Sequence, residues 1–413
     1  MRLLLIGSIA AGISCLGSQT AHSQDQPKRV EVQERSDETG DEDRSWLTRL
    51  RGFHSGLAKR GIEPEVGVIV PGSGLSFGAN VLVPHVPTLP IGAEFEGRIS
   101  LRGYRELVVR LGQVRNRRHT STLNPVDAEL SSLFSNAGPN TPGLAFYVEQ
   151  RHRHLPSLTL YGQNTRGSLT RADFGRVSLT TDAVLHWQAT PTLGIAARAG
   201  TLGLELFPGS DLDLANIETA FAGTRVLERA RYIVSAAGIS LDRRDAAEAP
   251  TRGFRVNGLV RHFAAQTGNH ASFTRASVDV RAFSQLSERH VAAFRLLGSV
   301  TRGAGQEGVP FYLMDSLGGG RTMRGFHSYR LRGNRLLTGS VESRWRVHKY
   351  LEVAPFVDAG IVGRPPLPGT STKILVTPGV GLRARTSKRV IFRADGAFGS
   401  EGARVAFAVD APF

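Results

Sequence analysis

The amino-acid sequence predicts an all-β protein: a transmembrane antiparallel β-barrel of about 16 strands, since single-chain bacterial barrels favour even numbers. Three observations lead to this prediction. The amino terminus has the pattern of an export signal, segments of alternating apolar and polar residues follow one another to the end, and the polar face of nearly every segment carries charges. Alternation with a period of two is typical of strands, because successive side chains point to opposite faces of a sheet.

Residues 1–23 have the pattern of a cleaved signal peptide. Arg2 precedes an apolar run from Leu3 to Ile13, and Ala21 and Ser23 place small residues where signal peptidase reads them. The run is too short for a stable spanning helix. Processing as a lipoprotein at Cys15 is the alternative. Because Cys15 is the only cysteine, we expect a mature chain without disulfides, zinc–cysteine sites or thiol catalysis.

Residues 24–59 are expected to form an acidic, disordered tether before a barrel at residues 60–413. Acidic residues crowd the part between Asp25 and Asp43, and few apolar residues accompany them, so the tract cannot bury a core. A tract this short is near the lower limit at which a domain folds unaided, so we expect no sizeable folded domain there. The rest of the chain is glycine-rich and basic, which accounts for the net charge of +15.

Candidate strands fill the region after the tether. The clearest alternation lies at residues 273–283, 337–347, 351–362, 374–386, 390–398 and 404–413, and less regular segments lie around 64–83, 91–116, 144–152, 174–189, 192–206, 231–241, 253–263 and 290–302. Short turns such as Lys349-Tyr350 and Thr386-Ser387-Lys388 alternate with long connections near 117–141, 207–230, 303–335 and 363–373. Short turns at one end and long loops at the other are typical of membrane barrels.

The segment 337–347 shows which face is expected to meet lipid. Leu337, Val341 and Trp345 share one face, whereas Glu342 and Arg344 lie on the other. A soluble β-sandwich gives the same alternation, with its apolar face buried and its polar face in water. Charges on the presumed inner face of nearly every strand, together with the export signal and a terminal aromatic residue, favour a barrel with a polar lumen and an apolar exterior.

The stretch Leu317-Gly-Gly-Gly-Arg-Thr-Met-Arg-Gly-Phe326 is the most informative motif, and it lies in the long connection 303–335. Glycine adopts backbone conformations closed to other residues, so we expect Gly320 and Gly325 to let the loop fold back and present Arg324 to a buried acidic partner. Alternation places Glu342 and Asp358 on the inner faces of the two following segments.

These residues resemble the BamA/TamA superfamily of outer-membrane proteins (bacterial surface antigen type), which also includes the two-partner-secretion transporters. The matching features are the Arg324-Gly325-Phe326 loop, Glu342 on the next segment, Phe356-Val-Asp-Ala-Gly360 on the one after, a closing strand ending in Phe413, and Asp242–Asp245 followed by Arg252-Gly253. The likeness covers roughly residues 60 to 413 and is most specific from residue 310 onward.

The resemblance implies a loop tucked into the barrel lumen, where Arg324 pairs with Glu342 and Asp358. It also implies a barrel that inserts or translocates polypeptides, or lipids, at the bacterial outer membrane, with weakly paired first and last strands that open to template a client strand. Members usually carry polypeptide-transport-associated domains before the barrel. This sequence has no room for one, so we expect a barrel-only member, and client capture by such domains is in doubt.

Two other functions stay open: a passive pore or structural surface antigen, and a secretion pore for one dedicated partner chain. An enzyme is not expected. The histidines are scattered without acidic residues at metal-ligand spacing, so no metal or cofactor site is expected either.

The expected partners follow from the outer-membrane prediction. Phe407 and Phe413 on the final segment are expected to form the signal that the barrel-assembly machinery reads when this chain itself is inserted. Outer-membrane lipid, including lipopolysaccharide, and unfolded outer-membrane client proteins are further candidates. Nucleic acid is not expected, because the basic residues are spread through the strands of an exported chain. The runs Arg115–His119 and Arg151–His154 either attract lipid phosphates or are ordinary solvated charges.

Overall fold

The computed structural model describes residues 61–84, 91–113, 142–163, 169–221, 229–267, 270–303, 309–363, 373–386 and 390–408. The expected signal peptide, Cys15, the tether at 24–59, the run Arg115–His119 and Phe413 lie outside the described residues. Regular structure in the described part is almost entirely β-strand, with a four-residue helix α3 (Ile217–Ala220) and a 3-10 turn η1 (Phe311–Leu313). None of its helices is long and apolar enough to span a bilayer.

The strands follow one another along the whole described chain. They are β1 (Ile62–Gly67), β2 (Ser76–Val83), β3 (Gly92–Ser100), β4 (Arg105–Gly112), β5 (Gly143–Gln163), β6 (Leu169–Gln188), β7 (Leu193–Pro208), β8 (Ala215–Asn216), β9 (Ala230–Asp242), β10 (Gly253–Ala265), β11 (Phe273–Ser287), β12 (His290–Gly303), β13 (Asp315–Leu317), β14 (Leu331–Gly333), β15 (Arg335–His348), β16 (Leu351–Gly363), β17 (Leu375–Arg385), β18 (Val390–Gly399) and β19 (Gly402–Ala408).

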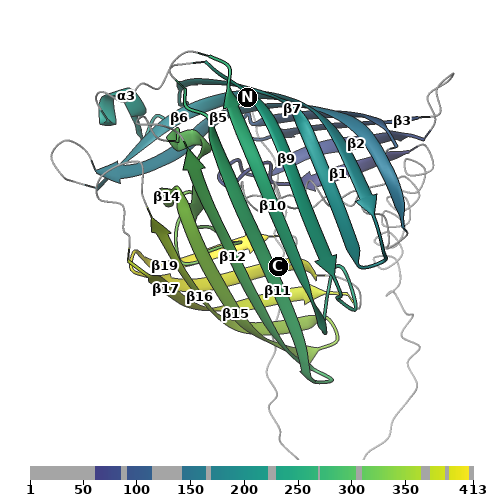
Figure 1. Ribbon diagram of the computed structural model, residues 1–413. Helices are drawn as coiled ribbons and strands as arrows, with labels where there is room; N and C mark the ends of the chain where they lie inside the picture. Colours follow the sequence, from purple (N-terminus) through teal and green to yellow (C-terminus); the bar gives the residue numbers. More distant parts are fainter. Residues whose placement is uncertain are drawn as a thin grey trace, which may run out of the picture. The chain divides into compact units, whose positions relative to one another are not determined.

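Seventeen of these strands belong to one sheet, drawn as the long wall of arrows in Figure 1. Apart from the two-residue β8, which runs parallel to β6, each strand pairs antiparallel with the next strand of the wall. Without β8, the described part of the wall has sixteen strands, in agreement with the predicted number of about 16. In the described residues the residue-by-residue pairing runs from β1 to β19, and none joins β19 back to β1.

The two faces of the wall are inverted relative to a soluble protein. In β15 the side chains of Ser340 and Glu342 are 7% and 1% exposed, whereas those of Leu337, Val341 and Trp345 are 47%, 56% and 48% exposed. The same alternation of buried charged and exposed apolar side chains runs through β16, β17 and β18. Burial of charge against exposure of valine and leucine is the arrangement expected of strands whose outer face meets hydrocarbon, as the sequence predicts.

Strand limits differ from the sequence prediction in two places. The segments 64–83 and 91–116 each contain a hairpin, β1–β2 and β3–β4, whose turns contain Gly72 and Gly103 at φ 91° and 80°. The hairpin β5–β6 is longer than predicted, with strands of 21 and 20 residues. A register shift between Leu155 and Leu158 interrupts the alternation of apolar and polar residues in β5. The predicted strand therefore ended too early, although the pairing with β6 continues beyond the shift.

The connection between β12 and β15 packs on the inner face of the wall. Its residues Leu317, Met323 and Phe326 form an apolar cluster with Tyr147 of β5 and Val184 of β6, all of them buried. Tyr147 and Val184 face inward, because their neighbours along each strand are the exposed Phe146 and Leu185. A second apolar cluster joins η1 and Met314 of the connection to β5, β6, β7, β9, β10 and β11. These two clusters hold the connection inside the curve of the sheet.

Candidate functional site

The tip of this connection is a compact loop closed by its own backbone. Gly318 and Gly319 have φ of 117° and 86°, in the region that favours glycine. The amide of Gly319 donates to the carbonyl of Phe326 at 3.0 Å, and the amide of Phe326 donates to the carbonyl of Met323 at 3.1 Å. The expectation that Gly320 and Gly325 supply the unusual conformations is wrong, because their φ values lie outside this region and the turn is made earlier in the motif.

Arg324 is 3% exposed and points at the inner faces of β15 and β16. Its Nε and Nη2 donate to Oδ2 and Oδ1 of Asp358 at 2.9 and 2.6 Å, and its backbone amide donates to Oδ2 at 3.0 Å. Its Nη1 donates to Oε1 of Glu342 at 2.6 Å, and Nη2 donates to Oγ of Ser340 at 3.0 Å. The planar guanidinium thus has a forked pair of bonds to one carboxylate and a charged bond to a second.

The aromatic ring of Phe356 also contacts the guanidinium of Arg324. The Cζ atom of Arg324 lies 3.2 Å from the ring centroid of Phe356, which is buried on the same face of β16 as Asp358. Stacking of a guanidinium on a ring stabilises the cation further in a site with little water. The sequence analysis missed Ser340 and named Phe356 only as part of a matching stretch, although each lies two residues before a predicted partner and so shares its face.

The charges around Arg324 continue into a larger network, which we call the Arg324 cluster. Oε2 of Glu342 accepts from Nε of Arg344 at 2.9 Å and from Nη2 of Arg383 at 2.7 Å. Nη1 of Arg383 donates in turn to Glu352 at 3.0 Å. The cluster comprises Arg324, Ser340, Glu342, Arg344, Glu352, Asp358 and Arg383, with no side chain more than 8% exposed among its ion-paired members. It connects the loop to three successive strands.

Gly325 and Phe326 fit the loop closely to the wall. A Cβ atom at Gly325 would lie 2.6 Å from Cγ2 of Thr377 and 3.1 Å from the amide nitrogen of Gly399. Glycine is required here by close approach of the backbone rather than by its torsion angle. Phe326 is 2% exposed inside the apolar cluster described above. The three residues of the motif therefore have separate roles, in ion pairing, close contact and apolar packing.

Two wall arginines bind the backbone of the loop from outside the Arg324 cluster. Nη1 of Arg295 in β12 donates to the carbonyl of Arg321 at 2.9 Å, and Nη2 of Arg393 in β18 donates to the carbonyl of Gly320 at 2.9 Å. Arg295 also pairs with Asp279, and Arg393 pairs with Asp395. The loop is thus held on both sides of β15 to β17. The sequence gave no signal that these arginines contact the loop.

The other residues singled out in the sequence lie elsewhere. Phe407 is 68% exposed on the outer face of β19 and stacks on Phe392 of β18, with ring centroids 5.9 Å apart. Arg151 and Arg153 of β5 both donate to Oε1 of Glu106, at 2.9 and 2.6 Å, so they belong to the interior rather than to a lipid-facing patch. No group of residues in the described part has the composition of a metal site.

Comparisons with known proteins concern most of this fold. A family model described as the Omp85 superfamily domain matches residues 156–401. The structure is similar to that of BamA from Haemophilus ducreyi lacking POTRA domains 1-3, with 14% sequence identity, a TM-score of 0.58, and coverage of 84% of this chain and 68% of that chain. It is also similar to CdiB from Escherichia coli, with 12% identity, a TM-score of 0.52, and coverage of 84% and 62%.

At such identities the likeness to solved structures concerns the fold. This chain spans about two thirds of the length of that BamA chain and less of the CdiB chain. A comparison with curated protein sequences finds no match.

Proposed function

This chain belongs to the Omp85 superfamily, whose model matches more than half of its residues, and from this premise we propose that it inserts or translocates polypeptides at the bacterial outer membrane. The proposal rests above all on one observation, the burial of Arg324 between Asp358 and Glu342. A loop fixed inside the wall by a charge cluster would hold the barrel in one conformation until binding of a client or partner shifts it to another.

The packing of the interior supports a gated barrel over a passive pore. Side chains that line a permanent water channel stay in contact with water. Here inward-facing charged residues in strands far apart in the sheet are almost completely buried, among them Arg110 of β4, Arg295 of β12 and Arg383 of β17. Each of them makes an ion pair with neighbouring carboxylates. Passage of a polypeptide would therefore require the loop to move or the wall to open.

The edges of the sheet support opening at one place. Within the described residues, the residue-by-residue pairing of β1 is with β2 and that of β19 is with β18, and each has one edge without such pairing. Strands inside the wall, such as β5, are paired on both sides. Strand edges with free backbone groups accept a further strand by addition. We propose that a client strand pairs with β19 while the Arg324 cluster keeps β15 to β17 in register.

The proposed partners are those of an outer-membrane barrel. The exposed apolar face is expected to contact outer-membrane lipid, including lipopolysaccharide, and unfolded outer-membrane proteins are the proposed clients. We further propose that Phe407, together with Phe413 at the chain end, is read by the barrel-assembly machinery during insertion of this chain. The pair Phe392–Phe407 gives this signal an aromatic surface on the outer face. An enzymatic role is not part of the proposal.

The test is reconstitution of the purified barrel in liposomes, followed by addition of an unfolded outer-membrane protein. We expect the client to fold faster than in protein-free liposomes, and the Arg324→Ala variant to lose this effect. The matched control is Arg302→Ala, because Arg302 is exposed at the end of β12 outside the cluster. Steady ion conductance without an effect on any client would contradict the proposal and indicate a passive pore. Activity toward a single partner chain only would identify a dedicated secretion pore instead.

A further inference from the structure

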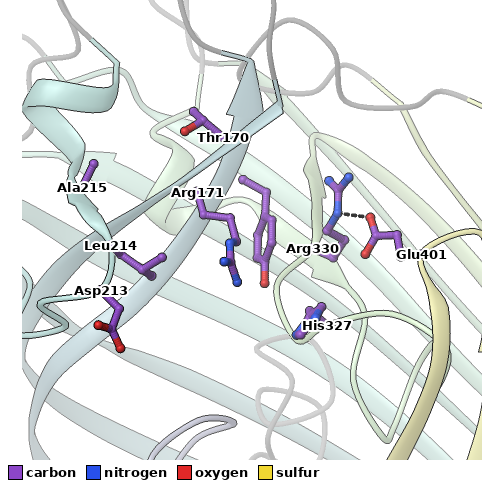
Figure 2. A pocket seen from close by; sticks show the side chains of 9 residues that line it. Thr170, Arg171, Asp213, Leu214, Ala215, His327, Arg330 and Glu401 are labelled. Atoms are coloured by element: carbon purple, nitrogen blue, oxygen red, sulfur yellow. Dashed lines mark hydrogen bonds and ion pairs between the residues drawn. The ribbon is translucent and has the colours of Figure 1, made fainter.

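A cavity of about 620 Å³ lies beside the loop, away from the Arg324 cluster. Its walls come from five separate segments: Tyr161 of β5, Thr170 and Arg171 of β6, residues 213–215 before and in β8, His327 and Arg330 of the loop, and Glu401 between β18 and β19. Figure 2 shows Arg171 projecting between the 213–215 segment on one side and His327 and Arg330 on the other. The volume is in the range of small-molecule sites.

The cavity has two arginines and two carboxylates, and one of the two arginines is ion-paired among the described residues. Arg330 forms an ion pair with Glu401, drawn as the dashed line in Figure 2. Arg171 is exposed, and within the described residues it has no carboxylate partner. Burial lowers the pKa of His327, and the positive charges of Arg404 and Arg171 lower it further, against the opposing charge of Glu401. The charges of the two arginines and the two carboxylates balance, and Arg171 is the arginine that has no ion pair among the described residues and can bind an anion.

Hydrogen-bonding groups and a ring accompany these charges. Thr170 and Asp213 provide a hydroxyl and a carboxylate, which suit the mixed donors and acceptors of sugar hydroxyls. The ring of Tyr161 lies beside both loop residues: the Cζ atom of Arg330 lies 5.1 Å from its centroid, and the centroid of His327 lies 6.3 Å away. Aromatic surface beside polar groups is common in sites that bind partly apolar sugar rings.

We propose that this cavity is a binding site for a phosphorylated saccharide, with Arg171 contacting the phosphate and Thr170 and Asp213 contacting hydroxyl groups. Tyr161 pairs directly with Arg171 across β5 and β6, and Ala172 pairs with Ala215, so three of the walls are fixed by backbone pairing. The saccharide is either free in solution or the head of a surface glycolipid. This inference goes beyond polypeptide insertion and stands on the cavity alone.

Calorimetric titration of the intact protein in neutral detergent tests the site. Glucose 6-phosphate is the soluble probe, glucose tests the need for the phosphate, and inorganic phosphate tests the need for the sugar. Phosphatidylcholine vesicles with and without lipopolysaccharide provide the glycolipid arm. We expect the Arg171→Ala variant to bind the phosphorylated probes at least about tenfold more weakly, because bonds to a charged partner are lost. The control Arg302→Ala should bind like the unmodified protein.

The outcomes separate the sources and decide the proposal. Saturable binding of glucose 6-phosphate that requires Arg171 supports a free sugar phosphate. Binding only to vesicles that contain lipopolysaccharide, again dependent on Arg171, supports a glycolipid head. Equal affinities of the unmodified protein and Arg171→Ala for both probes, or equal affinities for glucose and glucose 6-phosphate, would overturn the assignment. Because Arg171 lies outside the Arg324 cluster, client folding by Arg171→Ala in liposomes should be unchanged.

Discussion

Arg324 and Asp358, 34 residues apart in the chain, share three hydrogen bonds of 2.6 to 3.0 Å between the loop and the inner face of β16. One bond uses the backbone amide of Arg324 and two use its guanidinium, so the carboxylate fixes both the position of the loop and the direction of its side chain. Both residues are at most 3% exposed. In such surroundings the pair is stable only while every charge has its partner.

Arg324→Ala is expected to destabilise the folded barrel by about 3–5 kcal/mol, because Asp358 and part of Glu342 would stay buried without their cation. The midpoint of heat-dependent migration on gels, or the free energy of unfolding in urea, measures the effect. Arg302→Ala is the control and should leave both unchanged. A midpoint identical to that of the unmodified protein would refute the stabilising role of the cluster.

Removing both partners should be less costly than the sum of the single changes. In Arg324→Ala/Asp358→Ala the carboxylate that shares most bonds with Arg324 is removed with it, and Oε2 of Glu342 keeps its bonds to Arg344 and Arg383 although Oε1 loses its donor. A double-mutant cycle should give a coupling of about 1–3 kcal/mol. Strictly additive losses would mean that the two side chains stabilise the protein independently.

Gly325→Ala should destabilise the loop by about 1–3 kcal/mol, because the new Cβ would meet Thr377 at 2.6 Å. Gly320→Ala is the matched control in the same loop: there a Cβ would lie 3.4 Å from its nearest neighbour, the guanidinium of Arg393, which is ordinary contact. Limited proteolysis of the loop in both variants reports the difference. Equal protease sensitivity of the two variants would show that close packing at Gly325 is unimportant.

Val357→Arg tests whether the outer face of the wall contacts lipid or water. Val357 is 46% exposed near the middle of β16, next to the buried Asp358. In a lipid-facing wall the change should cost about 2–4 kcal/mol. Facing water it should matter little. Leu212, fully exposed in the connection after β7, provides the control Leu212→Arg, which should be neutral. A neutral Val357→Arg in urea-unfolding titrations in bilayers would exclude a lipid-facing β16.

Much of the fold was predictable from the sequence, because a side chain on a strand can point in only two directions, inward or outward. In β15 the inward face carries Glu342 and Arg344 and the outward face carries Leu337 and Val341, so Glu342 and Leu337 were assigned to faces without any knowledge of the neighbours. The hairpins inside 64–83 and 91–116 were not separated, because apolar residues continue through turns that depend on Gly72 and Gly103. The ends of strands depend on backbone torsion angles, and the alternation of apolar and polar residues carries no information about these angles.

For the site, the sequence predicts only the face of the strand on which each residue lies. Alternation puts Glu342, Asp358, Ser340 and Phe356 inward, but which of them a distant loop contacts depends on strand pairing and on the path of residues 309–334. The contacts of Arg295 and Arg393 with loop carbonyls have no sequence signal, since any inward arginine could make them. The role of Gly325 depends on Thr377, more than 50 residues away, and so required the folded structure.

Crosslinking of a client to the edge strand tests the proposed function most directly. Phe407 of β19 is replaced by a photoreactive phenylalanine analogue, and Val341 of β15, similarly exposed but in the middle of the wall, is replaced in the control. Proteoliposomes are then illuminated while an unfolded outer-membrane protein is folding. We predict client adducts at position 407 and none at position 341. Adducts at neither position, or equally at both, would contradict insertion by strand addition at β19.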